Sequence, residues 1–123
     1  MKIQSIPFVA LILISQVNIA VAKPTVCPSV ETIKAQKLIP DERPDGLYRV
    51  GTVSRFNTKE EWSFTTGLIN AKDWEEAAEI VHKGLGTLQL EYSWLDITGW
   101  CVYKLELAGE KSFGLAEYPP MRY

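Results

Sequence analysis

The chain is poor in the side chains on which most metal centres and many enzymes depend. It has one histidine and two cysteines in 123 residues. It lacks the C-x-x-C spacing of many metal sites and the D-x-D-x-D-G pattern of a calcium loop. It also lacks a glycine-rich phosphate loop: Gly84-Leu85-Gly86 has neither the fingerprint spacing nor a preceding strand. We therefore expect no metal and no cofactor.

A clustered basic surface is also missing. The formal net charge is −2, and the lysines and arginines are scattered along the chain. Proteins that bind nucleic acid usually gather basic residues on one face, where they contact the phosphates. Nucleic acid is therefore not an expected partner.

Only the N-terminus has a long hydrophobic run. A short basic start, Met1-Lys2, precedes the apolar stretch Ile6 to Ile14, and Ala20-Val21-Ala22 forms an A-x-A cleavage site. These parts, in this order, predict a cleavable signal peptide over residues 1–22 and one small domain over residues 23–123. The alternative is a retained membrane anchor, but Gln4, Ser15, Gln16 and Asn18 interrupt the stretch. We expect no membrane span after cleavage and a secreted or periplasmic protein.

The two cysteines, Cys27 and Cys101, both follow the predicted leader. In an exported protein an even number of cysteines favours a disulfide. The bridge closes a loop of about 75 residues, for which the chain-entropy model gives about 4.5 kcal/mol. The alternative is a reactive or metal-bound thiol, for which the sequence offers neither C-x-x-C spacing nor a second histidine.

Hydrophobic periodicity and turn residues predict an α+β fold. A helix begins at Ser29 and stops before Pro40, and 41–46 (DERPDG) is a turn-rich linker. The best-specified element is a second helix, for which both Asn70 and Asp73 are candidate caps, since Asn70 with Asp73 and Asp73 with Glu76 each have capping-box spacing. Its apolar stripe is Trp74, Ala77, Ala78 and Val81, and it closes at a left-handed Gly84 or Gly86. Strands are predicted at 47–56, 62–68, 88–94 and 100–107, with a further short edge strand possible at 113–118. The order α-β-β-α-β-β predicts an antiparallel sheet of four to five strands with two helices on one face and one disulfide.

The chain has four tryptophans, and aromatic residues can line a groove for a glycan or a peptide. Trp62, Trp74 and Trp94 fall on faces that the periodicity assigns to the core. Trp100 does not, because Cys101 takes the inward face of its strand. We therefore name Trp100, Tyr118 and Tyr123 as a candidate exposed patch, with core or edge packing as the alternative.

Catalytic candidates are few. His82, near the end of the second helix, would need a nucleophile and an orienting acid beside it. The acidic pairs Glu60-Glu61 and Glu75-Glu76 are sequence neighbours, whereas paired catalytic carboxyls face each other across a cleft. We assign no catalytic residue.

Two motifs, Cys27-Pro28-Ser29 at the start of the domain and Gly99 to Tyr103 (GWCVY) near its end, resemble small exported proteins of unknown function from Legionella and related intracellular bacteria. The resemblance implies export and contact with host or envelope partners, and it supplies no catalytic residues. Together these patterns favour a non-catalytic binding module, such as an envelope protein, an inhibitor or an effector acting by contact, with a protein or glycan ligand. The alternative is a small secreted hydrolase that uses carboxylates or His82.

Overall fold

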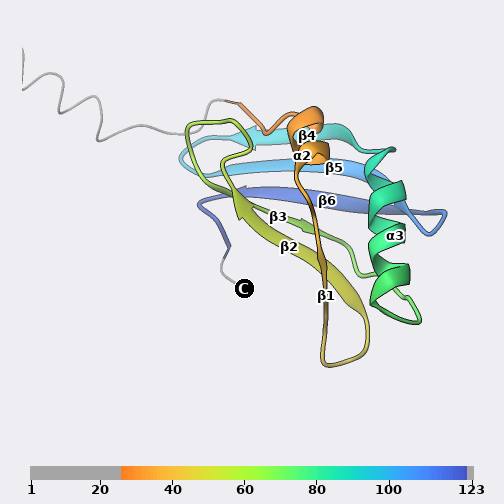
Figure 1. The fold of residues 1–123 in the computed structure, drawn as a ribbon. Coiled ribbons are helices and arrows are strands. Elements are labelled where there is room, and N and C mark those ends of the chain that lie inside the picture. Colours follow the sequence, from red (N-terminus) through yellow and green to blue (C-terminus); the bar gives the residue numbers. More distant parts are fainter. Residues whose placement is uncertain (1–25, 122–123) are drawn as a thin grey trace, which may run out of the picture.

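The computed structural model describes residues 26–121, in which six antiparallel strands form one open sheet accompanied by two helices (Figure 1). The predicted leader and Tyr123 lie outside these residues. In chain order the elements are α2 (Val30–Ala35), β1 (Pro40–Glu42), β2 (Tyr48–Ser54), β3 (Trp62–Thr66), α3 (Trp74–Leu85), β4 (Gln89–Leu95), β5 (Gly99–Leu107) and β6 (Glu110–Tyr118). The strands lie in the sheet in the order β1-β2-β3-β6-β5-β4.

The mixed α+β class and the disulfide are confirmed, whereas the predicted strand number of four to five is wrong. Part of the expected linker forms β1, which pairs with β2 through Pro40 opposite Val50 and Glu42 opposite Tyr48. Pro40 is tolerated because it is the first residue of a strand at the sheet edge, where no ladder hydrogen bond is required from its nitrogen. The order of elements is therefore α-β-β-β-α-β-β-β.

The C-terminal strand β6 is central rather than a short edge strand. It lies between β3 and β5 and pairs with β5 along its whole length, from Glu110 opposite Leu107 to Tyr118 opposite Gly99. The β5–β6 turn consists of Ala108 and Gly109, both with positive φ, which is the backbone that a tight two-residue hairpin requires. This strand joins the two halves of the sheet, because β3 and β5 are neighbours only through it.

One face of the sheet, here called the inner face, carries the core. On β5 it presents the buried residues Cys101, Tyr103, Leu105 and Leu107, as the alternation of that strand predicts. Both helices lie over this face (Figure 1). The opposite, outer face has no helix over it within residues 26–121.

Capping explains where α3 begins. Of the two candidate caps, Asp73 is the one used: its side chain accepts a hydrogen bond from the Glu76 backbone N–H at 2.9 Å, and the Glu76 carboxylate accepts one from the Lys72 N–H at 2.9 Å. The helix closes at Gly86 with right-handed rather than left-handed dihedral angles, φ −63° and ψ −21°. Gly84 has a different role: a Cβ there would lie 2.6 Å from the Glu106 carbonyl oxygen, so the missing side chain lets α3 approach β5 closely.

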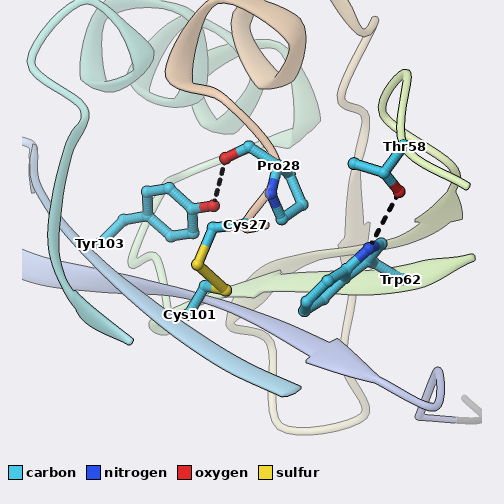
Figure 2. The surroundings of a disulfide bond; sticks show 6 residues. All are labelled: Cys27, Pro28, Thr58, Trp62, Cys101 and Tyr103. Carbon is cyan, nitrogen blue, oxygen red and sulfur yellow. Dashed lines mark hydrogen bonds between the residues drawn. A yellow bond between two sulfur atoms is a disulfide. The ribbon is translucent and has the colours of Figure 1, made fainter. Parts of the chain in front are cut away.

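The disulfide between Cys27 and Cys101 is present, with the two Cα atoms 5.9 Å apart (Figure 2). Beside it the Tyr103 hydroxyl donates a 2.5 Å hydrogen bond to the Pro28 carbonyl oxygen. Burial raises the pKa of Tyr103 above its ordinary value. These two links fasten the segment leading into α2 to the middle of β5, and the Ser29 side chain then caps the helix.

Candidate binding surface

The end of the β4–β5 hairpin gathers exposed apolar side chains. Trp94 and Trp100 are direct cross-strand partners, and they are 72% and 51% exposed. Ile97, in the turn between them, is 79% exposed. With Asp96 and Thr98 these residues line a hollow of about 420 Å³. We call Trp94, Asp96, Ile97, Thr98 and Trp100 the tip patch.

Local geometry explains why the two indoles share a side. The Asp96 N–H donates a 2.8 Å hydrogen bond to the Thr98 carbonyl, which closes the turn. Directly opposed residues of an antiparallel pair project from the same face. Since Cys101 occupies the inner face, its neighbour Trp100 points outward, and so does the opposed Trp94.

The sequence-based assignment of Trp94 to the core is wrong, although the alternation of β4 is real. The strand is exposed over nearly its whole length, whereas Leu88, just before it, is buried. The pairing register shifts between Leu90, opposite Tyr103, and Tyr92, opposite Val102. Such a bulge inserts one residue and reverses which side chains face the core.

Trp100 and Tyr118, which were predicted to share one exposed patch, lie on opposite faces of the sheet. Tyr118 pairs with Gly99 and lies on the inner face, where its ring centroid is 5.9 Å from that of the buried Trp62. Trp100 lies on the outer face. Tyr123, the third residue of the predicted patch, lies outside the described residues.

The other two tryptophans have structural contacts. Trp62 is fully buried, and its indole N–H donates a 3.1 Å hydrogen bond to the Thr58 hydroxyl (Figure 2). Trp74 is half exposed rather than buried at the start of α3, and its indole N–H donates a 2.9 Å hydrogen bond to the Pro40 carbonyl. That bond links α3 to the edge strand β1.

The catalytic candidates are distributed over separate elements. His82 is exposed near the end of α3, and Glu75 and Glu76 lie in the first turn of the same helix. Glu60 and Glu61 belong to the β2–β3 connection. A more polar hollow of about 630 Å³ near the start of β4, lined by Glu91, Lys104, Glu106 and Lys111 among others, includes none of these candidates. Among residues 26–121 no group of histidine, cysteine or acidic side chains is arranged to hold a metal ion.

One electrostatic contact is well defined elsewhere on the surface. Arg43 binds the Asp45 carboxylate, with Nη2 and Oδ2 3.0 Å apart, and this hydrogen bond holds the pKa of Asp45 below its ordinary value. The Leu47 N–H also donates to Asp45, at 3.0 Å. The contact fixes the β1–β2 turn and lies away from the tip patch.

No helix within residues 26–121 is long and apolar enough to cross a membrane. In comparisons with known proteins, no family model, no curated protein and no solved structure matches the chain.

Proposed function

We propose that the protein is a non-catalytic binding module that works outside the cytoplasm and contacts its ligand through the tip patch. The observation that carries this proposal is the grouping of Trp94, Ile97 and Trp100, all more than half exposed, around one hollow at the end of a hairpin. Large apolar side chains exposed together on a soluble protein commonly mark an interaction site.

The energetics suit recognition. Tryptophan is among the residues that most often dominate binding energy, since it buries a large area with few rotatable bonds. Burying one large apolar side chain contributes about 1.5–3 kcal/mol, so three of them supply several kcal/mol before the entropic cost of association. Asp96 and Thr98, at the edge of the hollow, supply the oxygen atoms that would orient a ligand.

The ligand is a protein or a glycan. Flat indole faces stack against either a sugar ring or an extended peptide, and the oxygen atoms at the edge can accept hydrogen bonds from hydroxyl or amide groups. A hollow lined by exposed side chains suits a ligand that lies across the surface rather than one that is enclosed.

The proposed location is the periplasm or the extracellular medium. Support comes from the leader pattern of residues 1–22 and from the Cys27–Cys101 disulfide, because such bonds persist mainly in oxidising compartments. Mass analysis of protein made from the full coding sequence tests this location. We expect an N-terminus at Lys23 and a mass lower by two hydrogens than that of the reduced chain, whereas an intact residue 1–22 segment or two free thiols would contradict it.

The binding proposal is tested with Trp94→Ala and Ile97→Ser on a glycan array and on an immobilised peptide library. The matched control is Leu68→Ala, since Leu68 is also half exposed but belongs to the β3–α3 connection. We expect saturable binding to one ligand class that both tip variants weaken at least about tenfold, as for hot-spot residues, and that the control retains. Binding that the tip variants and the control affect equally would reject the tip patch as the site.

A further inference from the structure

The outer face carries a second apolar surface beside the tip patch. Tyr92, Val102 and Leu115 lie in one row across β4, β5 and β6, and Phe113 follows two residues along β6. Alternation places these side chains opposite the inner residues Tyr103, Gly114 and Ala116. We call Tyr92, Val102, Leu115 and Phe113 the outer strip.

We propose that the outer strip is covered by a second copy of this chain, so that two sheets pack face to face about a two-fold axis. This homodimer goes beyond the proposed function because it concerns self-association, and its interface extends from the outer strip over Trp94 and Trp100 of the tip patch. Most soluble homo-oligomers are two-fold dimers in which the same surface serves both subunits.

The exposed area is of the size that such a dimer needs. Tyr92 is 62% and Phe113 50% exposed, and the adjacent Trp94 and Trp100 extend the same face. A large aromatic side chain offers roughly 150–250 Å², so these four expose on the order of 500 Å². Val102, Leu115 and the polar rim add to this, and a stable interface buries about 800 Å² on each partner.

The charges on this face complement each other across a two-fold axis that is perpendicular to the strands and passes through the Val102–Leu115 row. One step from the axis lie Trp100 and Glu117, and one step the other way lie Lys104 and Phe113. The axis brings Lys104 of one copy over Trp100 of the other and beside its Glu117. The contact therefore combines a cation–π interaction with an ion pair.

The two sheet edges offer less for self-association. The β1 edge is three residues long and begins with Pro40, and the β4 edge is interrupted by its bulge. Short strands, prolines and bulges are devices that hinder edge-to-edge pairing. The face, rather than an edge, is thus the surface suited to a second copy.

This arrangement has a consequence that rests on the proposed function. Because the dimer covers Trp94 and Trp100, the ligand and the second copy compete for the same two indoles. Saturating ligand should therefore dissociate the dimer, and dimerisation should lower the apparent affinity for the ligand.

Sedimentation velocity tests the dimer with protein made from the full coding sequence, so that any processing occurs as in the cell. Measurements span roughly 1–200 µM, the range of moderate affinities. The strip variant is Leu115→Glu, which places two like charges close together at the axis, and the control is Ile97→Glu, the same charge change in the tip patch. We expect concentration-dependent dimerisation that Leu115→Glu weakens at least about tenfold and Ile97→Glu leaves unchanged.

Charge reversal keeps the test independent of any folding defect in Leu115→Glu. Lys104→Glu and Glu117→Lys should each weaken the dimer, and the double variant should restore it. Within one copy these two residues lie two rows apart, about 13 Å, so rescue reports contact between copies. Near-ultraviolet circular dichroism confirms that each variant is folded.

Three results would overturn the proposal: a monomer at every concentration, a dimer insensitive to these substitutions, or a strip that binds a glycan or peptide while the protein stays monomeric. An Ile97→Ser variant that loses the ligand but still dimerises would separate the proposed function from the dimer, because Ile97 is outside the dimer interface. The two proposals can therefore fail independently.

Discussion

Removing the disulfide with Cys27→Ala and Cys101→Ala should cost this fold a large part of its stability. The two residues are 74 positions apart in the chain. For a loop of that length the chain-entropy model assigns about 4.5 kcal/mol to the cross-link. A domain of this size has a total stability of about 5–15 kcal/mol, so the variant would sit close to unfolding.

Other contacts in the structure both increase and decrease the stability that is lost with the disulfide. Cys101 is fully buried, so truncating it also leaves a small cavity and adds to the loss. In the other direction, the Tyr103–Pro28 hydrogen bond and the buried Ile33 still hold the α2 segment to the sheet. We expect a fall of about 3–5 kcal/mol in the free energy of unfolding.

Urea unfolding followed by tryptophan fluorescence measures this loss in the oxidised protein and in the double variant. The unfolded chain exposes more surface without the cross-link, so we also expect a larger m-value in the variant. A third sample, the unmodified protein in excess reductant, should resemble the variant. A loss below about 1 kcal/mol with an unchanged m-value would show that the cross-link does not restrict the unfolded chain.

Three further substitutions test individual contacts by the same unfolding measurement. Tyr103→Phe removes the hydrogen bond to Pro28 and should cost about 1 kcal/mol at neutral pH. Burial raises the folded-state pKa of Tyr103, so Tyr103 stabilises the fold fully below the unfolded-state pKa of about 10. Above that pH this stabilisation is lost, by up to about 1.4 kcal/mol per pH unit. The corresponding fall in the free energy of unfolding at alkaline pH should be absent in Tyr103→Phe, and an identical fall in both proteins would contradict the assignment. Gly84→Ala gains up to about 1 kcal/mol of helix propensity. The new Cβ is forced against the Glu106 carbonyl oxygen, an overpacking cost of about 1–3 kcal/mol, so we expect net destabilisation. A stabilised variant would show that α3 can shift away from β5. Asp73→Ala removes the cap of α3 and should cost about 1 kcal/mol, with Asp73→Asn as a control that retains most of it; equal losses in both would indicate a role for the charge rather than the cap.

The sequence predicted the elements that depend on local rules. The capping pair of α3 and the inward alternation of β5 could be predicted because both follow from residues close together in the chain. Cysteine number and the leader pattern were enough to predict the disulfide. In contrast, β1 could not be predicted, since its residues have turn-forming character and become a strand only by pairing with β2.

The tip patch was missed although the hairpin contained the signal. Trp94 and Trp100 are equally distant from the turn centre at Ile97, so a hairpin closed there puts both on one face. Placing Trp100 outward therefore required Trp94 to be outward too. The hydrophobic alternation of 88–94 concealed this, because alternation specifies two faces without identifying the buried one, and the bulge reverses the pattern midway.

Photo-crosslinking can show whether the protein contacts its ligand through the tip patch. A benzophenone amino acid is placed at residue 97 in one sample and at residue 68 in another, and both proteins are irradiated in the culture that produces them. We expect one discrete adduct, protein or glycan, from position 97 that is absent from position 68 and lost when Trp94→Ala is added. Adducts that are equal at both positions, or that persist without Trp94, would contradict it.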